Sequence, residues 1–209
     1  MPRTGTWWSS RRQPRSPMPA APPGAKVVLH VGCGRPDPEN LHERFRRPGW
    51  FEVRLDIDPD MRPDVVADII DMPEVSSESV DAVWSSHNIE HVFTHEVPKV
   101  LGEFFRVLRA GGEVLITTPD LQRAAERIAR GRLEDPLYES EAGAITPLDM
   151  VYGHVGYVAD GFEFMAHRTG YTAHTLTQKL RAAGFADVVV RRDRSDLSLW
   201  ATARRAGAA

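Results

Sequence analysis

Histidine side chains that could move protons stand close to a glutamate in one stretch of the chain and recur in two later stretches. The segment SSHNIEHV contains His87, Glu90 and His91, YGH ends at His154, and FMAHRTGY contains His167. Histidine changes its charge near neutral pH, which suits it to take a proton from a reacting group. These five residues are therefore the candidate catalytic residues.

Part of this set also spells H-x-x-E-H, a zinc-binding pattern of inverted metalloproteases. Two histidines four residues apart on a helix could share a metal ion, with Glu90 as the base. However, His87 directly follows an apolar run typical of a strand, where helical geometry is not expected, and no downstream ligand motif follows. A zinc-dependent hydrolase is kept as an alternative, and no metal ligands are predicted.

Two glycines and a later aspartate indicate a nucleoside cofactor. Gly32 and Gly34 directly follow the β-rich run KVVLHV, and Asp56 lies near the end of the next such run. In an open α/β sheet, ligands bind just beyond the carboxyl ends of the strands, and glycine there lets a ligand approach the backbone closely. A carboxylate at the end of the second strand can accept hydrogen bonds from ribose hydroxyls.

A dinucleotide is the wrong cofactor for this loop. The third glycine of G-x-G-x-x-G is replaced by Asp37, after Pro36, and an acid there would repel a pyrophosphate. The tyrosine and lysine, four residues apart, of a short-chain dehydrogenase are also missing: no lysine lies four residues after Tyr138, Tyr152, Tyr157 or Tyr171.

These residues need a scaffold, and the chain alternates strand-like runs with helical patterns from Lys26 onward. A helix over 97–108 carries one apolar stripe, with Thr94 as N-cap and Gly111 as stop. Further helices are predicted after Pro119 to about 129 and over 173–183, with a short, polar one around 38–46. Strands are predicted at 26–31, 51–57, 64–69, 80–86, 112–118, 186–193 and 196–203.

This alternation predicts a three-layer, Rossmann-like α/β sandwich built on a mostly parallel, seven-stranded sheet. The last two strands are joined by a tight turn at Arg194–Ser195, so they form a C-terminal antiparallel β-hairpin. Residues 132–172 have little periodicity and are expected to be an irregular insert that caps the substrate.

The chain resembles the class I S-adenosylmethionine-dependent methyltransferases of the small-molecule type over roughly residues 26–118 and 173–204. The resemblance is carried by the closing hairpin and by five stretches in the family's order. It implies S-adenosyl-L-methionine as cofactor and methyl transfer to oxygen or nitrogen of a small molecule. The five stretches are VLHVGCG, VRLDIDP, VVADIIDMP, VDAVWSSHNIEHV and FFRVLRAGGEVLITTPD.

The resemblance also implies roles for the residues at the strand ends. Gly32 and Gly34 would line the methionine and ribose of the cofactor. Asp56 would hold the ribose hydroxyls, and Ile57 would pack on one face of the adenine.

Further along, Asp68 would accept the exocyclic amine of the adenine, with Ile69 beside it. Ser85 and Ser86 would present backbone groups to the methionine amine. His30 stands where the family often has an acid, two residues before the first glycine.

The resemblance places the Glu90–His91 pair at the methyl-transfer site, and Arg168 beside His167 points to an anionic acceptor. A nucleoside-binding module without catalytic activity is a further alternative, because His30 and Pro36 depart from the family pattern.

The composition indicates which classes of partner and which cellular compartment to expect. The formal net charge is −3 with acids and bases mixed, which disfavours a nucleic-acid partner, and no apolar run reaches the length of a membrane span. Cys33 is the one cysteine, which suits the cytoplasm. Residues 1–24 are rich in proline and arginine and are expected to be a disordered extension before a single domain over 25–209. The oligomeric state is left open.

Overall fold

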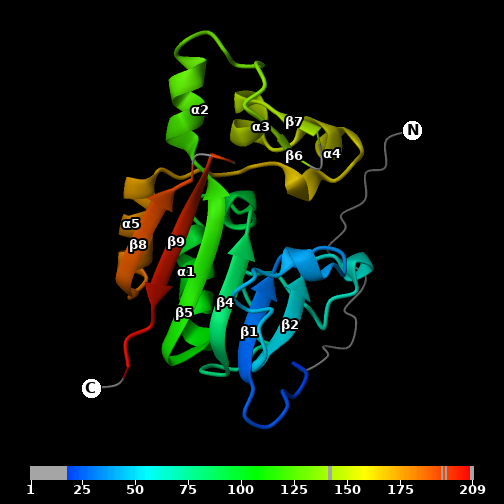
Figure 1. Ribbon diagram of the computed structural model, residues 1–209, viewed down its shortest axis with the longest axis vertical. Helices are drawn as coiled ribbons and strands as arrows, with labels where there is room; N and C mark the ends of the chain where they lie inside the picture. Colours follow the sequence, from blue (N-terminus) through cyan, green and yellow to red (C-terminus); the bar gives the residue numbers. More distant parts are fainter. Residues whose placement is uncertain (1–17, 141–142, 194, 196, 208–209) are drawn as a thin grey trace.

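The computed structural model describes residues 18–140, 143–193, 195 and 197–207. At its centre lies a seven-stranded sheet in the order β3-β2-β1-β4-β5-β9-β8 (Figure 1). The strands are β1 Lys26–Val31, β2 Trp50–Asp56, β3 Val65–Val66, β4 Val80–Ser86, β5 Leu108–Pro119, β8 Ala186–Arg192 and β9 Ser198–Arg204.

The pairing of the strands confirms the predicted sheet. β1 to β5 are parallel where they pair, whereas β9 runs antiparallel to both β5 and β8. The carboxyl ends of β1, β2 and β4 therefore meet at one edge of the sheet, where the glycine pair, Asp56 and the SSHNIEHV segment follow. The predicted bounds of β1 and β4 are those observed, but β3 is shorter and β5 is longer than predicted.

Alternating side chains of the strands fill two cores, one on each face of the sheet. The larger core packs against α1 (Val97–Val107) and α5 (Ala173–Ala182) and includes Phe104 and Leu176. The smaller core holds Trp84 and is covered by Leu41 and Phe45. The predicted helix around 38–46 is thus replaced by one 3-10 turn at Pro38–Asn40 followed by turns, which makes this third layer thin.

The predicted N-cap and stop residue of α1 are wrong, although the helix covers most of the predicted apolar stripe. The N-cap is Glu96 rather than Thr94, because the Thr94 hydroxyl is hydrogen-bonded to Thr169 at 2.9 Å. The helix stops at Val107 rather than near Gly111, since β5 already begins at Leu108. Gly111 lies inside that strand and donates its N–H to the Arg205 carbonyl at 2.9 Å.

The insert is more regular than the sequence indicated. After α2 (Leu121–Ile128) it contains the hairpin β6–β7, the helices α3 and α4, and a 3-10 turn. Figure 1 shows these elements above the carboxyl ends of the parallel strands, where a substrate cap was expected. Their bounds are β6 Tyr138–Ser140, β7 Gly143–Ile145, α3 Pro147–Tyr152, α4 Val155–Ala159 and the turn Glu163–Met165.

The ends of the chain differ in part from the prediction. Met18 and Ala21, which fall in the expected extension, pack against the larger core. Residues 1–17 lie outside the described residues, as does Arg194 of the predicted turn. Among the described helices, none is both long and apolar enough to cross a bilayer.

Candidate functional site

The two glycines of the first loop adopt the conformation that makes glycine necessary there. Gly32 has a φ of +63° and Gly34 a φ of +60°, the left-handed region that side chains disfavour. A Cβ atom at Gly32 would also lie 2.7 Å from the side chain of Asn88. The loop after β1 therefore keeps its backbone open to a ligand, with Asn88 beside it.

The carboxylate of Asp56 is held in place by the loops on either side. Its Oδ2 accepts the Gly34 N–H at 2.9 Å and its Oδ1 accepts the Asp58 N–H at 3.0 Å. The residue is 8% exposed. Each carboxylate oxygen has a further lone pair, so Asp56 can accept further hydrogen bonds from a polar ligand.

The residues predicted to surround the adenine differ in their exposure. Ile57 is 43% exposed and so offers an apolar surface, whereas Ile69 is 7% exposed and belongs to the larger core. Asp68 accepts the Ile70 N–H at 3.0 Å, and burial raises the pKa of its carboxyl. Ile57 and Asp68 are thus placed to contact a ligand, but the Ile69 side chain is engaged in packing.

His30 contacts a carboxylate on the neighbouring strand. Its Nδ1 lies 2.7 Å from Oε1 of Glu52 on β2. A cavity of about 460 Å³ opens here, and its lining includes His30, both loop glycines, Ser86 and Trp200. An imidazole fixed at Nδ1 by a carboxylate presents its other ring nitrogen, so His30 can serve a polar ligand in the position of the family's acid.

The two serines at the end of β4 have different surroundings. Ser86 lines the cavity and its hydroxyl lies 3.0 Å from that of Thr117. Ser85 is fully buried, and its hydroxyl has no hydrogen-bond partner within the described part of the chain. The side-chain nitrogen of Asn88 is likewise buried without a partner there. Two polar groups beside the glycine loop thus remain available to a ligand.

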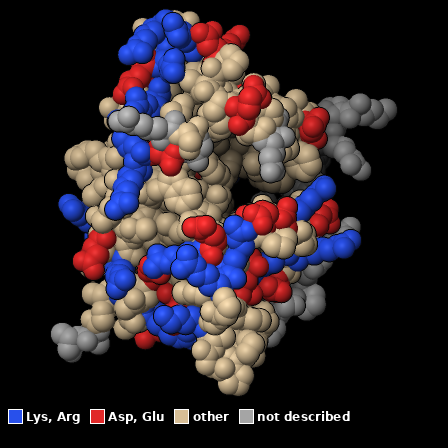
Figure 2. All heavy atoms as spheres, viewed as in Figure 1, with Lys and Arg blue, Asp and Glu red and all other residues tan. Residues whose placement is uncertain are grey.

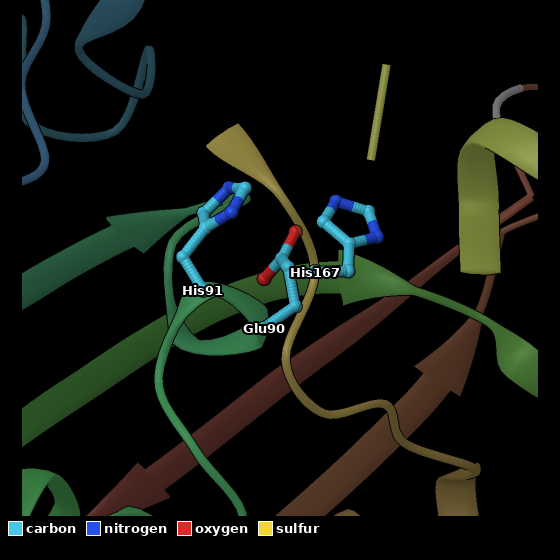
Figure 3. Close-up of side chains that lie close together, drawn as sticks. All are labelled: Glu90, His91 and His167. Carbon is cyan, nitrogen blue, oxygen red and sulfur yellow. The ribbon is translucent and has the colours of Figure 1, made fainter. Parts of the chain in front are cut away.

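The structure brings three of the five candidate catalytic residues into one cluster. Ligand atoms of Glu90, His91 and His167 all lie within 4.8 Å of one another, and Figure 3 shows the Glu90 carboxylate between the two rings. Backbone hydrogen bonds join the turn after β4 to the insert: the Glu90 carbonyl accepts the N–H groups of Arg168 at 2.8 Å and Thr169 at 3.1 Å.

The protonation states in this cluster follow from its contacts. Burial would raise the pKa of Glu90, but the contact with His87 and the nearby His91 and His167 hold the pKa below its ordinary value. The carboxyl is therefore ionised at neutral pH. Burial lowers the pKa of His167, so that ring is neutral there. Its Nδ1 lies 3.0 Å from the Met150 carbonyl and, as the donor, leaves Nε2 unprotonated.

His87 stands at the rim of the cluster in a strained conformation. Its φ is +45°, in the left-handed region, and a non-glycine residue held there costs about 1–3 kcal/mol. Its Nδ1 lies 3.4 Å from Glu90 Oε1, and its side chain is 44% exposed. The helix that H-x-x-E-H requires does not form, because only a 3-10 turn at Ile89–His91 follows.

His154 lies apart from the cluster. Its Nδ1 accepts the Tyr157 N–H at 3.3 Å and caps α4, and its ring packs against that of Tyr157. Arg168 is exposed and its guanidinium lies over the Phe93 ring, 4.9 Å from the ring centre.

Several residues that shape the site are not among the predicted site residues. The Thr118 hydroxyl donates to Glu90 Oε2 at 3.0 Å, and the buried Tyr171 hydroxyl donates to the Ile89 carbonyl at 3.0 Å. Asn88 and Glu52 are not among them either. Asn88 lies inside the quoted SSHNIEHV segment and Tyr171 ends the quoted FMAHRTGY segment, so both could be found there. Thr118 and Glu52 carry no sequence signal, because their roles depend on contacts between distant segments.

Comparisons with known proteins agree with this geometry. The family model described as a methyltransferase domain matches residues 29–116. A SAM-dependent methyltransferase from Archaeoglobus fulgidus has a similar structure, with a TM-score of 0.56 and 16% identity, covering 87% of this chain and 86% of that one. No curated protein matches the chain significantly.

Two further solved structures share the fold. The 1,6-didemethyltoxoflavin-N1-methyltransferase of Burkholderia thailandensis, solved with 1,6-didemethyltoxoflavin and S-adenosylhomocysteine, has a TM-score of 0.52 and 16% identity, covering 87% of this chain and 72% of that one. A complex of the Haloferax volcanii Trm112 methyltransferase activator with a putative methyltransferase matches with a TM-score of 0.55 and 18% identity. The match covers 92% of this chain and 86% of that one.

Proposed function

We propose that this chain, a class I S-adenosylmethionine-dependent methyltransferase, methylates an oxygen or nitrogen atom of a small molecule bound between the glycine loop and the insert. The observation that carries the proposal is the position of the histidine–glutamate cluster. Asn88, which contacts Gly32, lies between His87 and Glu90 in the sequence, so groups that handle protons adjoin the cofactor loop.

The residues present fit this cofactor. Asp56 is fixed by two backbone N–H groups and suits the ribose hydroxyls. Ser85 Oγ and Asn88 Nδ2 are buried polar atoms without partners in the described chain, which a polar ligand beside Gly32 would satisfy. When bound, S-adenosylmethionine supplies a methyl group on a sulfonium, which needs no further activation.

His30 and Glu52 act together as a positioning pair in this proposal. A carboxylate at Nδ1 fixes the ring of His30, and its other nitrogen can accept a hydrogen bond from an ammonium. The pair thereby replaces the acid that the family often has. Alignment of cofactor and acceptor by the whole site can contribute about 7–11 kcal/mol to lowering the barrier of a two-component reaction.

His87 is the candidate base. Its Nδ1 faces the ionised Glu90, which can hold the ring in one orientation and stabilise it after it takes a proton. Thr118 fixes the carboxylate from the other side. His91 and His167 are more deeply set, and their ring nitrogens face backbone carbonyl groups. His87 is therefore better placed than either to meet an acceptor.

A small acceptor is supported by the space that the fold leaves. Figure 2 shows a hollow between the insert and the ends of the strands, and the N1-methyltransferase with the same fold was solved with a small heterocycle. The exposed Arg168 supports an acceptor with negative charge. Acids and bases alternate over much of this face, apart from the arginines of α2, which favours a small molecule over a nucleic acid. The buried Cys33 suits the cytoplasm.

A labelled-methyl screen tests the proposal. The purified chain is incubated with methyl-labelled S-adenosylmethionine and fractions of small metabolites, and transfer of label is measured. We expect label in one or a few fractions, and transfer slower by about a hundredfold or more with the His87→Gln variant. Cofactor binding without transfer to any fraction would instead favour the non-catalytic module.

A further inference from the structure

We propose that Glu90, His91 and His167 bind one divalent transition-metal ion, such as Zn²⁺, beside the cofactor loop. The set differs from the H-x-x-E-H pattern, because His167 comes from the insert and replaces His87. Two imidazoles and one carboxylate form a common ligand set of catalytic zinc and non-haem iron sites. The binding of the ion does not depend on the proposed function, although its use in methyl transfer would.

The carboxylate of Glu90 is the first reason. It is 1% exposed, and its Oε1 accepts no hydrogen bond of good geometry within the described chain, the nearest ring nitrogen being His87 Nδ1 at 3.4 Å. A carboxylate buried this deeply is unfavourable unless positive charge or hydrogen-bond donors compensate it. A bound cation would supply that charge, and His87 could keep its contact as an outer partner of the ligand.

His167 has the arrangement of a metal-bound imidazole. Its Nδ1 lies 3.0 Å from the Met150 carbonyl, and donation of this N–H leaves the lone pair of Nε2 for a metal. Ligating histidines almost always donate their second ring nitrogen to such a carbonyl or carboxylate, which fixes the ring.

His91 adds a contact that needs a cation. Its Nδ1 lies 3.2 Å from the Ala166 carbonyl and its Nε2 lies 3.2 Å from the His87 carbonyl. A neutral imidazole has one N–H, so one of these nitrogens faces an oxygen without a hydrogen between them. A second proton or a metal ion would remove this repulsion. Ligands at about 2.1 Å from a tetrahedral ion lie about 3.4 Å apart, so the three candidate atoms, which all lie within 4.8 Å of one another, need to move closer to hold an ion.

The cluster is also preorganised. The insert is joined to the turn after β4 by two N–H donors to the Glu90 carbonyl and by the Tyr171 hydroxyl on the Ile89 carbonyl. Because all the candidate ligand atoms already lie within 4.8 Å of one another, small side-chain rotations suffice to close on an ion. Three protein ligands leave at least one position open, as in catalytic rather than structural sites. An acceptor oxygen is the group that this position would take.

Metal binding is measured on the full chain, expressed without a histidine tag and treated with a chelator. Zn²⁺ and Co²⁺ are titrated by calorimetry, and the visible spectrum of Co²⁺ reports nitrogen and oxygen ligands. We expect one ion per chain and at least a hundredfold weaker binding in Glu90→Gln and His167→Ala. His174→Ala, which removes an exposed histidine of α5, should bind like the wild type.

Two results would overturn the site: no stoichiometric ion in the wild-type chain, or unchanged affinity in His167→Ala. If a variant fails to fold, the wild-type chain still decides, because bound Zn²⁺ must raise its Tm with concentration. Binding of S-adenosylhomocysteine is measured on the same metal-free sample. Normal binding of that ligand without metal binding refutes the metal site alone, and the reverse result refutes the proposed cofactor site alone.

Discussion

The side chain of Asn88 occupies the space that a Cβ atom at Gly32 would need, with its Cγ 2.7 Å from that position. This contact joins the loop after β1 to the segment after β4, which carries the histidine–glutamate cluster. One contact therefore positions both the cofactor loop and the candidate base. A substitution at Gly32 should displace Asn88, and a substitution at Asn88 should change the loop around Gly32.

Gly32→Ala should weaken binding of S-adenosylhomocysteine by about tenfold or more, which corresponds to ~1.4 kcal/mol, because the new methyl group displaces Asn88. Gly24→Ala is the matched control: Gly24 also has a positive φ, of +80°, but nothing lies within 4 Å of its Cβ position. Both variants should lose about 1–2 kcal/mol of stability from backbone strain. Calorimetric titration separates them, and equal affinities would contradict the role of the contact.

His87→Gln should lower kcat by about a hundredfold or more, as expected when a general base is lost, and leave the affinity for S-adenosylhomocysteine unchanged. The acceptor identified by the labelled-methyl screen serves as substrate. His174→Ala is the control, since that histidine is exposed on α5. A fall in cofactor affinity with unchanged kcat would place His87 in binding rather than in proton transfer.

Arg106→Ala should destabilise the fold by about 1.5–3 kcal/mol, the usual contribution of hydrogen bonds to a charged group. The Arg106 guanidinium contacts Glu103 and donates to the Val75 and Met72 carbonyls at 2.8 and 2.9 Å. Urea unfolding at pH 7 measures the loss. Arg132→Ala, which removes an exposed pair 3.9 Å long, should change stability by less than about 1 kcal/mol.

The same ion pair makes stability depend on pH. The hydrogen bond from Arg106 lowers the pKa of Glu103 below 4.5, the value expected for the unfolded chain. The pair therefore stabilises the fold fully above pH 4.5, and this contribution is lost as the pH falls below 4.5 through the folded pKa. The difference in unfolding free energy between wild type and Arg106→Ala should shrink over that range. A constant difference would contradict the assignment.

The Cys33 thiol should react slowly with thiol reagents in the folded protein. Burial raises its pKa to about 12 from 9.0, which leaves about a thousandfold less thiolate at pH 8, and the thiolate is the reactive form. Ellman's reagent should label the folded chain slowly and the urea-unfolded chain fast. Rapid labelling of the folded chain would show that the loop between the two glycines opens.

The sheet could be predicted because its central strands are short apolar runs that are buried on both faces. β1 and β4 were predicted to the residue. The ends of α1 were not, because Thr94 bonds to Thr169 from a distant segment. The helices of the insert are short enough to lack a clear period, although TPLD before α3 is a capping box that the sequence displays: Thr146 accepts from the Asp149 N–H.

The candidate site was predicted only in its local parts. Asp56 and the glycines follow strands and could be placed by topology alone. By contrast, the approach of His167 to Glu90 depends on how the insert folds back, and no spacing in the sequence encodes it. The pairing of His30 with Glu52 depends on the register between β1 and β2.

The central claim is that S-adenosylmethionine binds where β1, β2 and β4 end, with its ribose on Asp56. Calorimetric titration of S-adenosylhomocysteine into the wild-type chain and Asp56→Ala tests it most directly. We expect one site in the wild type and an affinity lower by about tenfold to a hundredfold in the variant, from the loss of ~1.5–3 kcal/mol. No heat with the wild type, or equal affinity in both, would contradict the account.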